Sequence, residues 1–204
     1  MNKKEEHEIG IGAHAKPWPI GNQYDTDLLQ NGDRRNVIDK YRYWSVTAIK
    51  ADLDLNRNSL HIAIENWQHD MNIGTIVRNA NAFNVAAVHI IGKHHWNKRG
   101  AMVTNLYMNV FYHKTVDEFV AAVGERHIIA IDNQPGAKNL SDVQLPPNCV
   151  LVFGGEGPGL SVEMIEKSEQ MVQIEQFGST RSVNVGVASG IVVYEWMQTH
   201  VLNT

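Results

Sequence analysis

A short apolar segment that runs directly into glycines constrains the fold of this chain more than any other feature. Residues 149–153 read CVLVF, and residues 154–159 hold four glycines and one proline. A continuous apolar run of this length is typical of a strand that is covered on both faces. Glycine accepts positive φ angles and lets the backbone approach a ligand closely. Because open α/β sheets bind ligands beyond the carboxyl ends of their strands, we expect a binding loop here.

Strand-like and helix-like segments alternate along the chain from Ser59 onward. The predicted strands are 59–65, 86–92, 127–132, 149–153 and 171–176, and the predicted helices are 71–83, 115–126, 161–168 and 184–200. The helical segments place apolar residues at helical spacing, and Thr115 stands where an N-cap belongs. This alternation predicts an α/β fold with a mostly parallel sheet and helices on both faces.

The composition is that of an ordinary globular protein, with 43% hydrophobic and 20% charged residues. No apolar run reaches the roughly 20 residues of a membrane span, and Met1–Gly10 lacks the apolar segment of a signal peptide. The single cysteine, Cys149, excludes an intrachain disulfide and multi-cysteine zinc sites. The adjacent pair His94 and His95 does not have metal-ligand spacing. We therefore expect a cytoplasmic protein without a metal.

Two basic patches stand out against the net charge of −4. The first combines cations with aromatic residues (Arg34, Arg35, Lys40, Arg42 and Lys50 with Tyr41, Tyr43 and Trp44), as does the second (Lys93, His94, His95, Lys98 and Arg99 with Trp96). Basic side chains neutralise phosphates and aromatic rings stack on unpaired bases, which favours RNA as a partner. Each patch taken alone is more typical of an ordinary solvated surface.

The first 57 residues are expected to form an N-terminal arm, and residues 58–204 the main domain. Residues 1–32 are polar and predict an irregular segment, whereas residues 33–50 predict a short helix that carries the first basic patch. The arm is therefore a possible RNA contact.

The glycine-rich segment Phe153–Ser161 does not match the common nucleotide-binding loops. No Gly-Lys-Ser/Thr follows it, so it is not a P-loop, and Leu160 occupies the third position of a GxGxxG pattern. Four glycines around the lone Glu156 exceed what a simple tight turn needs. We therefore favour a ligand-binding loop of another kind.

Two further segments place polar residues at the starts of helices. In the segment NIGTIVR, Asn72 stands at an N-cap position, and in FGSTRSVNVGVA Ser182 and Asn184 precede the last predicted helix. Helix N-termini expose unpaired amides that suit a polar ligand. Taken alone, the first segment is better explained as a capped helix with a solvated arginine, and plain capping by Ser182 or Asn184 is the alternative for the second.

Together, the three segments resemble the three motifs of the TrmH (SpoU) family of RNA 2′-O-ribose methyltransferases, within the SPOUT superfamily. The first motif is matched by Asn72, Gly74 and Arg78, the second by Phe153–Ser161 with Glu156, and the third by Ser182, Val183 and Asn184. The resemblance runs from about Ser59 to His200 and does not cover residues 1–57. The third motif departs from the family pattern, because Ile174-Glu175-Gln176 stands where Ile-Pro-Met is usual.

This resemblance implies the fold, the cofactor and the assembly. Members of the family have a C-terminal trefoil knot, bind S-adenosylmethionine in it and form homodimers. The predicted helix Asn184–His200 is accordingly a candidate dimer interface. The implied substrate is a ribose 2′-hydroxyl in RNA, and we favour tRNA over rRNA because no separate RNA-binding domain precedes the core.

The resemblance also implies the site residues. The cofactor-binding set is Phe153, Gly154, Gly155, Gly157, Ile174, Gln176, Val183 and Asn184. The catalytic set is Arg78, Asn72, Glu156, Ser182 and Asn184. A guanidinium is a poor base because its pKa exceeds ~12, so we expect Arg78 to stabilise developing negative charge on the ribose oxygen.

Two other classes of function compete with this interpretation. A non-catalytic RNA-binding protein with the same fold is disfavoured by the intact Arg78, Glu156 and Asn184. A dinucleotide-dependent enzyme is disfavoured by the failed GxGxxG pattern. Titration with S-adenosylmethionine and with NAD would discriminate between the classes.

Overall fold

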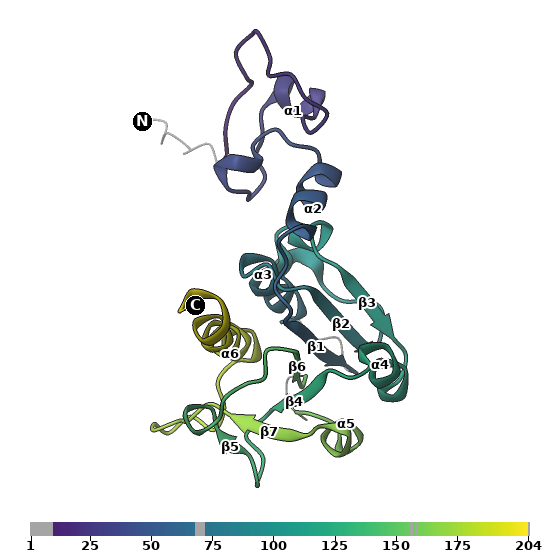
Figure 1. Cartoon of the computed structure of the whole chain (residues 1–204), viewed down its shortest axis with the longest axis vertical. Helices are drawn as coiled ribbons and strands as arrows, with labels where there is room; N and C mark the ends of the chain where they lie inside the picture. Colours follow the sequence, from purple (N-terminus) through teal and green to yellow (C-terminus); the bar gives the residue numbers. More distant parts are fainter. Residues whose placement is uncertain (1–9, 68–71, 156, 158, 204) are drawn as a thin grey trace, which may run out of the picture. The chain divides into compact units, whose positions relative to one another are not determined.

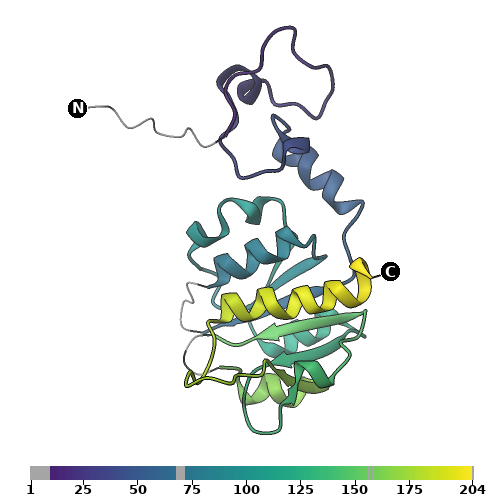
Figure 2. The ribbon, with the colours of Figure 1, turned by 90° about the vertical axis from the view of Figure 1, so that its left-hand side faces the viewer.

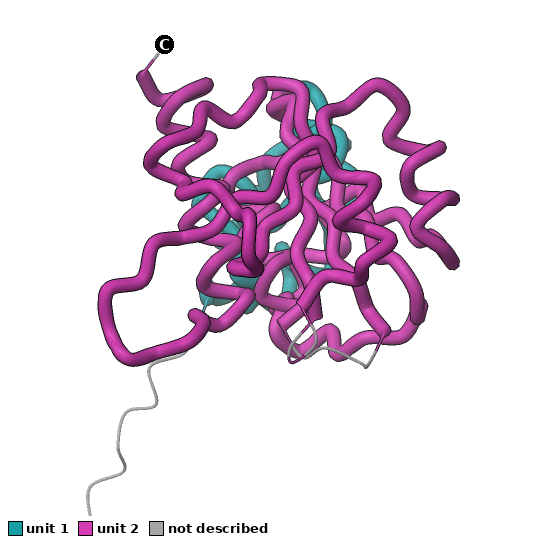
Figure 3. The backbone as a smooth tube through the Cα atoms, turned by 90° about the horizontal axis from the view of Figure 1, so that it is seen from below, with its two compact units in different colours: residues 1–55 teal, residues 56–204 magenta. Residues whose placement is uncertain are grey.

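The computed structural model describes residues 10–67, 72–155, 157 and 159–203, and divides the chain into two compact units. The first unit comprises residues 1–55 and the second residues 56–204 (Figure 3). The second unit contains all the strands of the sheet.

A seven-stranded sheet forms the centre of the second unit (Figure 1). Its strands are β1 (His61–Asn66), β2 (Ala87–Gly92), β3 (Val110–His113), β4 (His127–Ile131), β5 (Lys138–Asn139), β6 (Cys149–Phe153) and β7 (Gln170–Gln173). They lie in the order β3-β2-β1-β6-β4-β7-β5, and every pair of neighbours is parallel. The predicted parallel sheet is confirmed. Strand β6 lies between β1 and β4, so its glycine-rich loop emerges between the carboxyl ends of two other strands.

Helices cover both faces of the sheet. They are α3 (Ile73–Ala82), α4 (Val116–Val123), α5 (Val162–Lys167) and α6 (Val185–Met197), with short 3-10 turns η2 (Lys98–Ala101), η3 (Thr104–Leu106) and η4 (Leu140–Asp142) and a π-helical turn η5 (Gln198–Leu202). Figure 2 shows α6, in yellow, lying along one face of the sheet. Among the described residues, no helix combines the length and the apolar character that a membrane crossing requires.

The strand β6 shows why both faces must be covered. Its residues Cys149, Leu151 and Phe153 pack into the core beneath α3 and α6, whereas Val150 and Val152 pack into the core beneath α4 and α5. All five are fully buried. The alternation of side chains along a strand therefore divides one continuous apolar run between two cores.

Cys149 begins this central strand and has no exposed surface. Burial raises the pKa of its thiol to about 12, because a thiolate would lose its hydration there. The thiol is therefore protonated and shielded in the folded protein.

Several predicted elements differ from the observed ones. The predicted strand 171–176 is too long, because β7 ends at Gln173 and Ile174–Gln176 continue as a loop. Strands β3 and β5 were not predicted. Both are short edge strands, and Phe111 and Tyr112 of β3 are exposed, so neither has the apolar pattern of a buried strand.

The predicted helix over residues 33–50 is wrong. The first unit instead contains α1 (Thr26–Asn31), a 3-10 turn η1 (Asp39–Tyr41) and α2 (Val46–Asp54). A helix cannot pass through Tyr43, whose φ is +63°. The buried Asp33 holds this turn, since one of its carboxylate oxygens accepts a 3.0 Å hydrogen bond from the Tyr43 amide.

Asp33 also explains part of the first basic patch. Burial opposes its ionisation, but a salt bridge of 2.7 Å to Arg35 and backbone hydrogen bonds lower the pKa of the carboxyl to about 2. Lys40 pairs with Asp52, and Lys50 pairs with Asp54 at 3.1 Å. Much of this patch is therefore engaged in contacts within its own unit.

A chain of three histidines crosses β1, β2 and β3 beneath α4. His61 Nδ1 lies 2.9 Å from His89 Nε2, and His89 Nδ1 lies 2.9 Å from His113 Nε2. Burial lowers the pKa of His61 to about 4 and that of His89 to about 3, and it also lowers the pKa of His113. The rings are therefore neutral. In each of the two contacts, one ring nitrogen donates a hydrogen bond and the other accepts it.

The row of three histidines predicts that the free energy of unfolding falls in acid. The folded-state pKa of His89 lies below its unfolded value of 6.5, so the unfolded chain binds the proton first as the pH falls. The contribution of His89 to the free energy of unfolding is complete above about pH 6.5 and declines towards pH 3. At pH 5 about 2 kcal/mol of it is lost. Urea unfolding of the wild type and of His89→Gln from pH 7.5 to 5 measures this difference.

The exposed His94 gives the matched control. His94→Gln should keep the steep wild-type pH dependence, whereas His89→Gln should flatten it even if its stability at pH 7.5 is lower. Equal pH dependence in the wild type and His89→Gln contradicts the prediction.

Candidate functional site

The glycine-rich loop after β6 folds back on itself. Gly155 and Gly159 form an isolated antiparallel bridge. A Cβ on Gly154 would lie 2.2 Å from the carbonyl carbon of Gly159, so only glycine fits there. Gly157 and Gly159 have φ angles of +98° and +71°. The glycines therefore serve a tight backbone reversal at the carboxyl end of the sheet.

Two carboxylates from the neighbouring strands hold the end of this loop. Glu65, the fifth residue of β1, accepts hydrogen bonds of 2.7 Å from both the amide and the hydroxyl of Ser161. Asp132, directly after β4, accepts a 2.9 Å hydrogen bond from the amide of Leu160. Because β6 lies between β1 and β4, the loop is held from both sides.

Glu65 is completely buried, and its contacts explain how a carboxylate is tolerated there. Besides Ser161, the indole nitrogen of Trp67 donates to it at 3.0 Å. Ser161 in turn is the N-cap of α5 and accepts a 3.1 Å hydrogen bond from the Met164 amide. A buried charge of this kind is stable only with such donors, so it fixes their positions.

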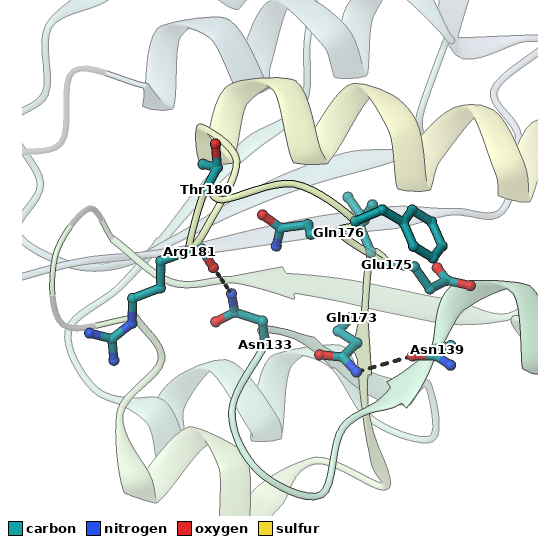
Figure 4. A pocket seen from close by; sticks show the side chains of 9 residues that line it. Asn133, Asn139, Gln173, Glu175, Gln176, Thr180 and Arg181 are labelled. Atoms are coloured by element: carbon teal, nitrogen blue, oxygen red, sulfur yellow. Dashed lines mark hydrogen bonds between the residues drawn. The ribbon is translucent and has the colours of Figure 1, made fainter.

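A cavity of about 430 Å³ lies where β7 ends (Figure 4). It is lined by residues of the β4–β5 loop and β5 (Asn133 and Asn139), of β7 (Gln173) and of the segment between β7 and α6 (Ile174, Glu175, Gln176, Phe177, Thr180 and Arg181). Asn133 donates a 2.7 Å hydrogen bond to the carbonyl of Arg181, which joins two of these walls. The volume lies within the range of small-molecule sites.

Gln176 gives the cavity an unsatisfied polar atom. Its Oε1 is buried and has no hydrogen-bond partner within the described part of the chain. Such an unpaired acceptor is rare in folded proteins. Gln176 is one of the residues that sequence reasoning assigned to the cofactor, as is Ile174, which lines the same cavity.

The first and third motifs meet although they are far apart in the sequence. Asn184 donates from Nδ2 to Asn72 Oδ1 at 3.0 Å, across 112 positions. Asn184 also caps α6, because its Oδ1 accepts from the amides of Gly186 and Val187. Asn72 stands at the N-cap position of α3 but makes no side-chain capping bond. Its side chain instead contacts the cap of the other helix.

Close packing continues this junction along the two helices. Asn79 of α3 donates to the carbonyl of Gly186 and to the hydroxyl of Ser189, both at 2.9 Å. A Cβ on Gly186 would lie 2.9 Å from Thr75 Cγ2. The helices that carry motifs one and three therefore pack at a fixed separation.

The other predicted site residues take varied positions. Arg78 is exposed on α3, and Ser182 and Val183 are exposed just before Asn184. Phe153 and Gly154 are buried at the end of β6, and Gly155 and Gly157 lie in the loop. Glu156 lies outside the described residues. The structure brings Asn72 and Asn184 into contact and places Ile174 and Gln176 in one cavity.

Sequence reasoning missed Glu65, Asp132, Asn133 and Arg181. Glu65 and Asp132 stand at or just past the carboxyl ends of buried strands, which is where α/β sheets bind ligands. That position was a usable signal. The order of the strands, which shows that both carboxylates flank β6, was not available from the sequence.

Comparison with known proteins places the chain in a family. Residues 59–194 match the SpoU rRNA Methylase family. The chain is 26% identical over 176 residues to a tRNA (guanosine(18)-2′-O)-methyltransferase of Borreliella burgdorferi, which covers 83% of this chain and 79% of the relative. It is 26% identical over 210 residues to the 23S rRNA (guanosine-2′-O-)-methyltransferase RlmB of Pasteurella multocida, covering 96% of this chain and 74% of the relative.

Solved structures show the same fold. The TrmH/SpoU tRNA modifying enzyme of A. aeolicus aligns with a TM-score of 0.68 at 22% identity, covering 78% of this chain and 83% of that one. The SpoU methyltransferase AviRb of Streptomyces viridochromogenes, in complex with AdoMet, aligns with a TM-score of 0.63 at 20% identity, covering 74% and 64%.

The fold and the family match define an α/β RNA methyltransferase of the SPOUT class that uses S-adenosylmethionine. The chain belongs to the SpoU rRNA Methylase family. Its cavity is lined by Ile174 and Gln176, two of the residues that the resemblance assigns to this cofactor. The trefoil knot remains a prediction from the resemblance.

Glu65 gives a direct test of the loop arrangement. Glu65→Gln replaces one acceptor oxygen with an amide group that opposes the Ser161 donors, so we expect a loss of about 2 kcal/mol in the free energy of unfolding. The displaced loop should also weaken S-adenosylmethionine binding about tenfold, measured by calorimetric titration.

Glu163→Gln is the control for this variant, since Glu163 is exposed on α5, next to the same loop. It should bind the cofactor like the wild type. Unchanged affinity and stability in Glu65→Gln would show that the buried carboxylate does not position the loop.

Proposed function

We propose that this chain methylates a ribose 2′-hydroxyl of tRNA with S-adenosylmethionine as the donor. Transfer to RNA follows from the family to which the chain belongs. The observation that carries the site assignment is the 3.0 Å contact between Asn184 and Asn72, which joins the first and third motifs at the starts of α3 and α6.

The cofactor, when bound, supplies a methyl group made electrophilic by its sulfonium. The chain's own residues hold and orient it. Ile174 and Gln176 line the cavity. The folded-back loop, in which Gly155 pairs with Gly159, is proposed to offer the backbone groups of Gly154 and Gly155 to the cofactor. The proposed cofactor-binding set is completed by two residues of the second motif, Phe153 and Gly157, and two of the third, Val183 and Asn184.

Arg78 has the proposed role of stabilising the reacting oxygen. It is exposed on α3, within two turns of Asn72, and a guanidinium binds phosphate and developing negative charge well. The ribose hydroxyl loses its proton to solvent or phosphate as the oxygen takes the methyl group. Asn72, Ser182, Asn184 and Glu156 are proposed to position Arg78 and the ribose.

A homodimer belongs to the same proposal. Val187, Ile191 and Tyr194 lie on successive turns of α6 and are 56%, 42% and 46% exposed. An apolar stripe of this kind on a helix is typical of an interface. A cytoplasmic location also remains part of the proposal.

The choice of tRNA over rRNA is tested by mapping 2′-O-methylation in cells with and without the gene. We expect the loss of one tRNA position. Loss of an rRNA position instead would retain the chemistry and correct the substrate. An unchanged methylation map, with purified protein inactive on both RNAs, would reject the function.

Replacement of Arg78 tests the mechanism. Arg78→Ala should lower kcat at least about 100-fold, because a donor to the transition state is removed. Its S-adenosylmethionine affinity should stay within about twofold of wild type, measured by calorimetric titration beside a methyl-transfer assay. Lys167→Ala removes an exposed cation of α5 and should leave both quantities unchanged. Wild-type turnover in Arg78→Ala contradicts the assignment.

A further inference from the structure

Residues 72–116 are segregated in charge from the rest of the chain. They contain no Asp or Glu and five Lys or Arg residues, whereas the whole chain carries 22 acidic residues and a net charge of −4. The five cations are Arg78, Lys93, Lys98, Arg99 and Lys114. All five are exposed. A surface that concentrates cations in an acidic protein favours a polyanionic ligand.

Residues 72–116 gather at the β3 edge of the sheet. They span α3, β2, η2, η3 and the edge strand β3. Lys93 follows the carboxyl end of β2, and Lys98 and Arg99 form η2. The cations therefore lie near the end of the sheet that holds the glycine-rich loop, and beside the helix that carries Arg78.

Aromatic side chains stand among these cations. The rings of His94 and Tyr112 lie 3.9 Å apart between centroids, tilted by 35°. Trp96 donates from its indole nitrogen to the Tyr112 hydroxyl at 3.3 Å and packs on the core. Tyr112 is 38% exposed, so its ring is accessible although its orientation is fixed. We call Lys93, His94, Lys98, Arg99 and Tyr112 the basic platform.

Close contacts fix the basic platform relative to α3, the helix that carries Arg78. The buried Asn66 donates to the carbonyls of Lys93 and His95, at 2.6 and 3.1 Å. A Cβ on Gly74 would lie 2.7 Å from the Ala101 amide nitrogen, so the backbones of α3 and η2 touch. A ligand on the platform is therefore held at a fixed distance from the helix of Arg78.

We propose that the basic platform binds the RNA substrate next to the methylated nucleotide. In this arrangement Lys93, Lys98 and Arg99 contact phosphates, and the paired rings of Tyr112 and His94 stack on an unpaired base. The proposal rests on the proposed function and names the surface that selects single-stranded or loop RNA. A protein partner is disfavoured because residues 72–116, which include the platform, carry five Lys or Arg residues and no compensating acid.

Binding measurements with the intact protein test this surface. The probes are an unmodified tRNA transcript and a blunt RNA duplex, followed by fluorescence anisotropy at several salt concentrations. The double variant Lys98→Ala/Arg99→Ala should bind tRNA about tenfold more weakly and reduce the slope of log affinity against log salt by about 1.5. Tyr112→Ala should weaken tRNA binding about tenfold and duplex binding little, and Tyr112→Phe should restore it.

Lys138→Ala on β5, at the opposite edge of the sheet, is the matched control and should bind tRNA like the wild type. S-adenosylmethionine titration of every variant should give the wild-type affinity, which shows that the fold is intact. In the transfer assay the platform variants should raise the KM for RNA and leave kcat within about twofold.

The outcomes separate this proposal from the proposed function. Wild-type RNA affinity and salt slope in Lys98→Ala/Arg99→Ala overturn the platform, even if the wild type methylates RNA. Equal loss of duplex and tRNA binding in Tyr112→Ala overturns the stacking of an unpaired base. A wild-type protein that binds tRNA through the platform but methylates no RNA overturns the proposed function and leaves the surface assigned.

Discussion

The burial of Glu65 is the constraint on which the site depends. A carboxylate without exposed surface must be surrounded by donors, and here these are the amide and hydroxyl of Ser161 and the indole of Trp67. Since Ser161 also caps α5, one charge fixes the end of the glycine-rich loop and the start of the next helix. The conformational freedom of four glycines is thereby limited to a single reversal.

The order of the strands places a second carboxylate on the other side of the same loop. Strand β6 lies between β1 and β4, so Glu65 and Asp132 approach the loop from opposite sides. On the α3 and α6 face, Asn184 and Asn72 join two further segments of the site. The first and third motifs are thus joined by a direct polar contact, and the second motif is held by carboxylates of the two neighbouring strands.

Much of the second unit could be predicted from local patterns, because its strands are buried on both faces. The strand 149–153 was predicted at its observed bounds, and Thr115 caps α4 as expected. The first unit could not be predicted in this way, since a buried Asp33 and the positive φ of Tyr43 depend on tertiary contacts. The extra length predicted for β7 has a similar cause, because Ile174–Gln176 leave the sheet to line the cavity. Within the candidate site, motif residues were accessible from the sequence, whereas the carboxylates that hold the loop required the strand order.

The position of Cys149 has a consequence for studying this fold. The only thiol of the chain lies fully buried at the start of the central strand, where its pKa is raised to about 12. A thiol reagent can modify it only after the strand separates from the helices above it, since the reactive thiolate forms only in water. The rate of labelling at low reagent concentration therefore reports the opening equilibrium of the domain centre, without any introduced probe. Cofactor or RNA that binds the folded state would slow that labelling in proportion to its affinity, whatever reaction follows.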